Sequence, residues 1–216
     1  MNLCDLVSDL KQSSGYEGLV KTLHKKLPQQ PFVLAGWSYG GTLACAYAAL
    51  YPTKVKSLLT MAATPCFVQR FDWPAGMQQE VFSEFLANFQ SQPKKTLEQF
   101  MLLCIMGCRN KKAIIEALTN TSFSERDDVD NLLFILESMG TTDIRHLIGD
   151  IQCPVIHFYA KKDALVSIST AEAIAKHYQH HHIHVVSSGH SFIVESAENI
   201  AEHLSNFCLP GGSKNQ

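Results

Sequence analysis

One stretch, FVLAGWSYGGTLACAYAAL (residues 32–50), constrains the fold of this chain more than any other. An apolar run ends in Gly36-Trp37-Ser38-Tyr39-Gly40, and an alanine-rich segment follows directly. A strand that turns sharply into a helix crowds the residues around its turn, so glycines are needed two residues before and two residues after the central serine. The pattern therefore predicts a strand over 31–36, a helix over 38–50, and Ser38 held clear of the backbone between them.

Strands and helices alternate on both sides of this turn. A helix is expected before it, over 16–27, and a second strand after it, over 55–62. The alternation resumes late in the chain, with strands over 154–160 and 182–187 and helices over 168–179 and 196–208. Such an order is typical of a parallel α/β sheet that is covered by helices.

The middle of the chain, residues 66–149, has helical periodicity and no strand pattern. The helices expected there lie near 77–89, 97–104, 111–118 and 128–138. The sequence therefore predicts a discontinuous α/β core over 1–65 and 150–209, an all-helical cap over 66–149, and a disordered tail over 210–216.

A serine hydroxyl is a poor nucleophile at neutral pH and needs a base and a group that orients the base. After a strand–turn–helix serine, the acid and then the histidine are expected along the chain, each in a loop that follows a strand. Asp163, in KKDALVS, and His190, in SSGHSF, both satisfy this order. The carboxyl ends of parallel strands meet at one edge of a sheet. We therefore expect Ser38, Asp163 and His190 to be nucleophile, orienting acid and base.

Each of these residues also has an ordinary structural explanation. Ser38 can be a serine between flexible glycines, Asp163 a turn or helix-cap carboxylate, and His190 one of ten histidines that happens to lie in a loop. Only their joint placement favours catalysis. The helix that starts after Ser38 points its first N–H groups at the site, so the N–H of Tyr39 can donate to a developing oxyanion.

Composition argues against several classes of partner. The 216 residues carry a formal net charge of −2, which gives no overall attraction to nucleic acid or to an anionic membrane. No apolar run reaches the roughly 18–20 residues that a membrane span needs. Asp5 and Asp9 stand where a secretory signal would need a basic start and an apolar stretch. We therefore expect a cytoplasmic protein with no nucleic-acid or membrane partner.

Two groups of potential metal ligands have structural explanations. Cys104 and Cys108 share a helical face, but two ligands do not make a zinc site, and seven scattered cysteines favour reduced thiols that fill the core. Four histidines at a helix-to-strand junction have no acidic or cysteine partner nearby and are expected to be solvated: His180, His181, His182 and His184. No metal and no cofactor is expected.

Seven stretches carry a resemblance to a known family, in order from about residue 16 to the C-terminal helix: LAGWSYGGTLA, MAATPCF, DWPAGMQQEVFSEF, KTLEQFMLLCIMG, TTDIRHL, CPVIHFYAKKDALV and SGHSF. On these stretches the chain resembles the α/β-hydrolases and, more narrowly, the pimeloyl-[acyl-carrier protein] methyl ester esterases of biotin synthesis. The resemblance implies a triad of Ser38, Asp163 and His190, the Tyr39 N–H in the oxyanion hole, and no cofactor.

The same resemblance implies roles for the cap. The segment that lines the family's acyl channel corresponds to residues 100–104, so the substrate-binding candidates are Trp37, Tyr39, Phe100, Met101, Leu102, Leu103 and Cys104. Basic residues of the family's cap dock the acidic carrier protein, and the candidates here are Lys94, Lys95, Arg109, Lys111 and Lys112. Gln99 stands where the family has an arginine. The alternatives are ordinary helix packing and a solvated charged face.

One departure concerns the start of the chain. Family members place several strands before the nucleophile strand, and a His-Gly loop among them supplies the second oxyanion donor. Here the nucleophile strand begins at residue 31, and no His-Gly motif precedes it. We expect the N-terminal part of the sheet and this donor to be missing.

The leading functional hypothesis is a serine carboxylesterase that hydrolyses the methyl ester of pimeloyl-[acyl-carrier protein], with the carrier protein as partner. The alternatives are a carboxylesterase or thioesterase for small acyl esters and a truncated, non-catalytic binding protein. The sequence leaves the oligomeric state open.

Overall fold

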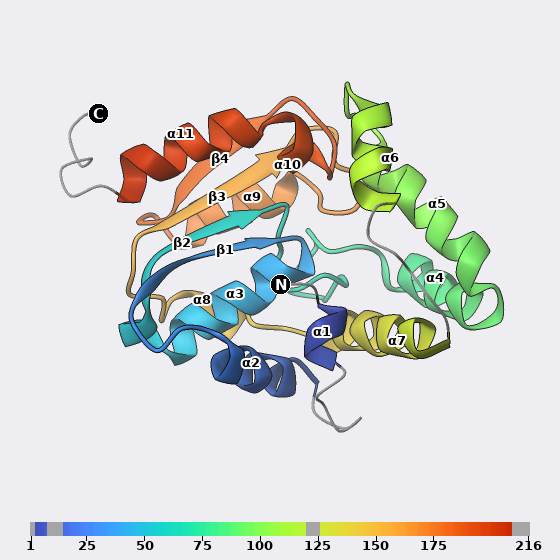
Figure 1. Ribbon diagram of the computed structural model, residues 1–216, viewed down its shortest axis with the longest axis horizontal. Helices are drawn as coiled ribbons and strands as arrows, with labels where there is room; N and C mark the ends of the chain where they lie inside the picture. The colour runs from blue at the N-terminus through green and yellow to red at the C-terminus, as the bar shows by residue number, and fades with distance from the viewer. Residues whose placement is uncertain (1–2, 8–14, 120–125, 209–216) are drawn as a thin grey trace.

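The computed structural model describes residues 3–7, 15–119 and 126–208 (Figure 1). Its sheet has four parallel strands in the order β1-β2-β3-β4: β1 (Phe32–Trp37), β2 (Val55–Met61), β3 (Val155–Ala160) and β4 (His182–Val186). Gly36 of β1 pairs with Thr60 of β2, and Thr60 pairs with His157 of β3. Within the described residues β1 pairs only with β2, so it forms one edge of the sheet.

Helices cover both faces of the sheet, because successive side chains of a strand point to opposite faces. Leu58 belongs to the core cluster that includes Leu43 and Ile174, whereas Leu59 belongs to the cluster that includes Phe192 and Ile200. The first face is covered by α3 (Tyr39–Leu50), α8 (Arg145–Ile148) and α9 (Ser169–His177), with α2 (Gly15–Lys26) lying against α3. The second face is covered by α10 (Phe192–Glu195) and α11 (Ala197–Cys208).

The central strands and helices have the residue types that their positions in the fold require. All six residues of β3 are buried, as expected for a parallel strand with helices on both faces. The small side chains of α3 let it lie close to β1 and β2, and nine of its residues are buried. A 3₁₀ turn (Pro52–Lys54) leads from α3 into β2, and α2 ends two residues before Pro28.

The segment between β2 and β3 is helical: α4 (Gln79–Ser91), α5 (Pro93–Ile105), α6 (Lys111–Thr119) and α7 (Arg126–Thr141) precede α8. In Figure 1 the first three of these helices stand beyond the carboxyl ends of the strands. Residues 62–78, before α4, form irregular turns, and the β-bridges in the described part of this segment, such as Cys66 with Asp143, are isolated. The largest core cluster continues from the sheet into α7 through Ile135 and Met139.

Each strand and helix predicted for the sheet lies within two residues of its expected limits. Three short helices, α1 (Cys4–Val7), α8 and α10, and the 3₁₀ turn were not predicted. Leu6 and Val7 of α1 are buried, and the helix contacts α7 and α2. None of the described helices is both long and apolar enough to cross a bilayer. The predicted tail, 210–216, falls outside the described residues.

Candidate active site

Ser38 stands on the turn between β1 and α3 in a backbone conformation that L-residues rarely adopt, with φ 54° and ψ −129°. Its N–H donates to the carbonyl oxygen of Met61, the last residue of β2, at 2.8 Å. Its own carbonyl oxygen accepts the N–H groups of Gly41 and Thr42 at 2.9 and 3.2 Å. The neighbouring strand and the first turn of α3 therefore hold the strained residue in place.

Two glycines make this turn possible, and they differ in part from the predicted pair. A Cβ on Gly36 would lie 2.5 Å from the carbonyl oxygen of Gly40 and 2.7 Å from Cα of Gly41. A Cβ on Gly41 would lie 2.6 Å from Cβ of Ala63. At Gly40 an added Cβ would meet nothing within 4 Å. The close approach of β1, α3 and the end of β2 therefore requires Gly36 and Gly41, and the prediction that crowding requires Gly40 was wrong.

The three side chains that the sequence placed at the ends of β1, β3 and β4 form one hydrogen-bonded chain. Nε2 of His190 lies 2.9 Å from Oγ of Ser38, and Nδ1 lies 2.8 Å from Oδ2 of Asp163. Only 1% of the side chain of either His190 or Asp163 is exposed. The carboxylate can hold Nδ1 protonated, which leaves Nε2 free to accept the proton of the serine hydroxyl.

Asp163 also organises its own loop. Its Oδ1 accepts the N–H groups of Leu165 and Val166 at 2.8 and 2.9 Å, while Oδ2 faces His190. Asp163 therefore makes both kinds of contact that the sequence analysis considered for it, hydrogen bonds within its own loop and a hydrogen bond to the histidine. The bonds to the backbone fix the direction in which Oδ2 points.

Trp37, a substrate-binding candidate, also contacts the histidine. Its indole Nε1–H donates to the carbonyl oxygen of His190 at 3.0 Å, and the two ring centroids are 5.3 Å apart. Trp37 also borders the cavity beside Ser38. Sequence reasoning missed this hydrogen bond, because it joins residues 153 positions apart.

Tyr39 is tied to the cap by its side chain. The phenol oxygen lies 2.6 Å from Oγ of Ser138 and 2.9 Å from Oγ1 of Thr142, at the end of α7. Burial raises the pKa of Tyr39 to about 12, although both hydrogen bonds act in the opposite direction, so the phenol stays neutral. The first N–H groups of a helix have no partner within the helix, so the backbone N–H of Tyr39 is the group that can serve an oxyanion.

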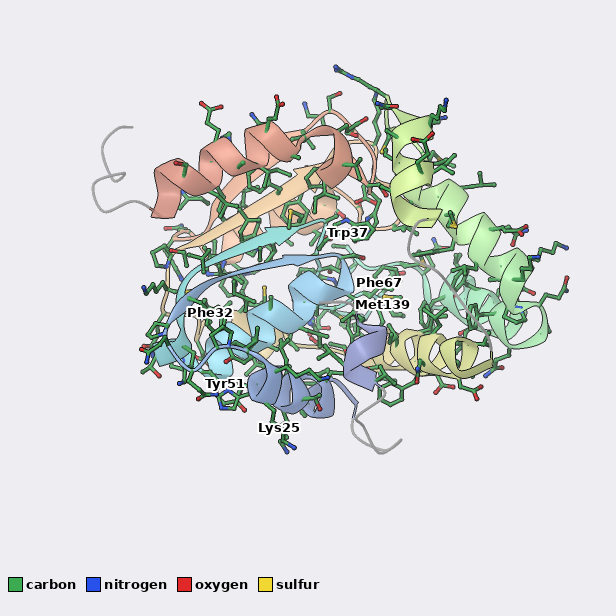
Figure 2. All side chains as sticks on the ribbon, viewed as in Figure 1. Lys25, Phe32, Trp37, Tyr51, Phe67 and Met139 are labelled. Atoms are coloured by element: carbon green, nitrogen blue, oxygen red, sulfur yellow. The ribbon has the colours of Figure 1, made fainter. Side chains whose placement is uncertain are left out.

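A cavity of about 770 Å³ opens beside Ser38 and His190. Its lining is mostly apolar and extends from Trp37 at the carboxyl end of β1 to Phe32 at the other end. Figure 2 shows these two residues at opposite ends of the strand, with Met139 near the end of α7. Phe85 and Phe100, whose ring centroids are 5.8 Å apart, belong to the wall formed by α4 and α5.

Of the cap segment 100–104, only Phe100 belongs to the lining of this cavity. Leu102 is 60% exposed, and Met101 and Leu103 are partly buried away from the lining. Cys104 is buried, and burial raises the pKa of its thiol to about 12. Its carbonyl oxygen accepts the N–H of Ser191 at 3.0 Å. The geometry thus favours helix packing over acyl binding for residues 101–104.

The five basic candidates for docking are all exposed, but they do not form one cluster. Lys94 and Lys95 stand at the start of α5, whereas Arg109, Lys111 and Lys112 follow its end. A helix of 13 residues is about 20 Å long. The five candidates therefore form two separate basic groups, one at each end of α5.

The histidines near residue 180 are not all at the surface, so that prediction needs one correction. His180 and His182 are exposed and His184 is partly buried, but His181 is only 6% exposed. Its Nδ1 lies 3.0 Å from Nε2 of His157, which pairs in turn with Thr60. His181 is therefore buried against His157 of β3, a residue that lies 24 positions away in the sequence.

Among the described residues no group of three or more His, Cys, Asp or Glu side chains is arranged to hold a metal ion. Cys104 and Cys108 are both buried, as predicted, and Cys45, Cys66 and Cys153 are also free thiols.

Residues 15–197 match the family described as alpha/beta hydrolase fold. A pimeloyl-[acyl-carrier protein] methyl ester esterase of Hamiltonella defensa is 33% identical over 174 residues, which are 80% of this chain and 66% of that protein. The biotin biosynthesis bifunctional protein BioHC of Teredinibacter turnerae is 28% identical over 201 residues, 88% of this chain and 35% of that protein. The chain thus spans less than two thirds of the length of either relative.

A solved esterase from Exiguobacterium antarcticum superposes with a TM-score of 0.79, covering 93% of this chain and 76% of that chain at 19% identity. At 19% identity, this structural similarity shows only that the two chains share a fold. Together with the sequence match, it confirms the predicted fold class and the resemblance.

Proposed function

Because this chain belongs to the α/β-hydrolase family, we propose that it is a carboxylic ester hydrolase in which Ser38 is the nucleophile. The observation that carries the proposal is the hydrogen-bonded chain from Ser38 through His190 to Asp163, with donor–acceptor distances of 2.9 and 2.8 Å. The positive φ of Ser38 supports it further, since strain of this kind persists where the surrounding structure enforces it and often marks a site of chemistry.

The reaction follows from the geometry. Oγ of Ser38 attacks the ester carbonyl carbon while Nε2 of His190 takes its proton, and the N–H of Tyr39 donates to the oxygen that becomes negative. His190 then returns the proton to the leaving alcohol as the acyl-enzyme forms. A water molecule, deprotonated by His190, attacks the acyl carbon, and Ser38 leaves with the proton restored. Asp163 stabilises the imidazolium that forms twice in this cycle.

The finer proposal concerns the substrate. We propose a methyl ester at the end of an acyl chain that is carried by acyl carrier protein, as the names of the relatives indicate for those proteins. The apolar cavity beside Ser38 suits an acyl chain, and the exposed basic side chains of the cap suit an acidic carrier. The products are methanol and a free terminal carboxylate.

A fluorophosphonate probe tests the chemistry first. We expect it to modify the wild-type protein at Ser38 and to leave Ser38→Ala unmodified, and the wild type alone to hydrolyse a p-nitrophenyl ester. A folded wild-type protein that neither reacts with the probe nor hydrolyses the ester would instead support the non-catalytic binding protein.

Charge reversal then separates the two substrate classes. Lys94→Glu with Lys95→Glu alters one basic group, and Lys111→Glu with Lys112→Glu alters the other. We expect at least one of these double variants to raise KM for the carrier-bound methyl ester and to leave hydrolysis of the p-nitrophenyl ester unchanged. Equal effects on both substrates would favour an esterase for small free esters.

A further inference from the structure

The end of α5 and the turn that joins it to α6 (residues 104–110, together called the cap turn) lie against the loop that carries His190 (residues 187–191, the histidine loop). The N–H of Ser191 donates to the carbonyl oxygen of Cys104 at 3.0 Å. Gly189 has no room for a side chain, because an added Cβ would lie 1.7 Å from the carbonyl oxygen of Met106. The cap therefore touches the residues on both sides of His190.

The cap turn also meets the loop that carries Asp163. Gly107 adopts a φ of +81°, and an added Cβ there would lie 2.5 Å from Cβ of Lys162. The N–H of Lys162, the residue before Asp163, donates to the carbonyl oxygen of Ser188 at 2.9 Å. The cap turn, the histidine loop and the Asp163 loop are thus packed together on one side of the site.

One carboxylate joins these parts. Oε2 of Glu195, at the end of α10, accepts the N–H groups of Arg109 and Asn110 at 2.9 and 3.0 Å. Oε1 accepts the hydroxyl of Ser188, which is buried and stands two residues before His190. Burial acts to raise the pKa of Glu195, but the hydrogen bonds from Ser188, Asn110 and Arg109 outweigh it and lower the pKa, so the group is a carboxylate at neutral pH.

We infer that Glu195 is a positioning residue, which joins the cap turn to the histidine loop and thereby holds Nε2 of His190 within reach of Ser38. The inference rests on the proposed function, because it gives His190 the role of base. Glu195 acts through Ser188 and the backbone and does not touch the reacting atoms. Displacement of a catalytic group by about 1 Å can cost about 10²-fold in rate, so a link of this kind matters to the chemistry.

The test is the rate at which excess fluorophosphonate modifies Ser38, because this single step needs the nucleophile and its base but no docking on the cap. We expect Glu195→Ala to slow the modification at least tenfold and to lower kcat for a p-nitrophenyl ester by a similar factor, with little change in KM. Glu195→Gln should stay within about threefold of the wild type, since its amide oxygen can accept the two N–H groups while its NH₂ donates to Ser188.

Two further variants make the test specific. Glu198→Ala removes an exposed carboxylate from the first turn of α11 and should react like the wild type. Ser188→Ala cuts the link to the histidine loop and leaves the bonds between Glu195 and the cap turn, so it should slow the modification as Glu195→Ala does. Ser188→Ala also serves if Glu195→Ala fails to fold.

The outcomes separate the two proposals. If folded Glu195→Ala and Ser188→Ala react at the wild-type rate, the positioning role is wrong and the proposed function stands. If Glu195→Gln is as slow as Glu195→Ala, the hydrogen-bond argument is likewise overturned. If the wild type itself does not react, the proposed function fails before the role of Glu195 is addressed.

Discussion

Oδ2 of Asp163 lies 2.8 Å from Nδ1 of His190, and only 1% of each of the two side chains is exposed. The other oxygen of Asp163 accepts two backbone N–H groups, from Leu165 and Val166. A carboxylate can satisfy all three donors because both of its oxygens are acceptors. An amide at the same place cannot.

Asp163→Asn should therefore nearly abolish ester hydrolysis while the protein stays folded. The amide oxygen will turn to the two backbone N–H groups, which brings the NH₂ against Nδ1 of His190. The imidazole must then carry its proton on Nε2, where it cannot accept the proton of Ser38. In serine proteases the same change lowers kcat about 10⁴-fold. The measurement is kcat for a p-nitrophenyl ester, with Asp150→Asn, at an exposed aspartate, as the control. A loss below tenfold would contradict the assignment.

The glycines of the turn offer a matched pair for stability. Gly41→Ala places a Cβ 2.6 Å from Cβ of Ala63 and 2.9 Å from the carbonyl oxygen of Gly36, so it should lower the free energy of unfolding by about 1–3 kcal/mol. Gly40→Ala meets nothing within 4 Å and should leave stability unchanged or raise it by up to about 1 kcal/mol, since alanine favours the helix. Urea unfolding measures both. Equal destabilisation by the two changes would contradict the geometry.

Much of the site could be predicted because it depends on local patterns and one general rule. The glycine spacing marks the turn at Ser38, and the alternation of strands and helices places Asp163 and His190 at the same edge of a parallel sheet. The separation of Lys95 from Lys111 could also have been predicted, since the helix between them has a known rise per residue.

The parts that could not be predicted are contacts between the cap and the core. The hydrogen bond of Tyr39 with Ser138 joins residues 99 positions apart, and that of Glu195 with Arg109 joins residues 86 apart. Nothing in either local sequence specifies the partner, because the partner is set by how α7 and α6 sit against the sheet. The burial of His181 against His157 is a contact within the core, but it also joins residues that are distant in sequence, 24 positions apart.

Substitutions at two residues of α5, Phe100 and Leu102, test where an acyl chain lies. Phe100 lines the cavity, whereas Leu102 on the same helix is 60% exposed. Phe100→Ala should raise KM for a p-nitrophenyl ester of a medium-length acyl chain about fivefold, which corresponds to about 1 kcal/mol of lost apolar contact for a partly buried ring, and should change KM for the acetate ester less. Leu102→Ala should change neither value. If Leu102→Ala has the larger effect, the chain lies outside the cavity.

The buried pair His157 and His181 makes the stability of the fold depend on pH. Nδ1 of His157 lies 2.6 Å from Oγ1 of Thr60, and its Nε2 lies 3.0 Å from Nδ1 of His181. Burial lowers the pKa of His157 to about 3, and burial together with the charges of its neighbours lowers that of His181 to about 4. An unfolded histidine has a pKa of about 6.5.

Between about pH 6 and pH 4 the unfolded state therefore binds protons that the folded state does not, so the free energy of unfolding falls as the pH falls. His157 alone contributes a slope of about 1.4 kcal/mol per pH unit in this window. Replacing it by glutamine, His157→Gln, should lower the stability at pH 7 but make the pH dependence shallower by about that slope. His146→Gln, at an exposed histidine, should keep the wild-type slope and serves as the control. Urea unfolding of the wild type and both variants at pH 7, 6 and 5, followed by tryptophan fluorescence, gives the slope of the free energy of unfolding against pH for each protein. Equal slopes for His157→Gln and the wild type would show that His157 is not held neutral in the fold.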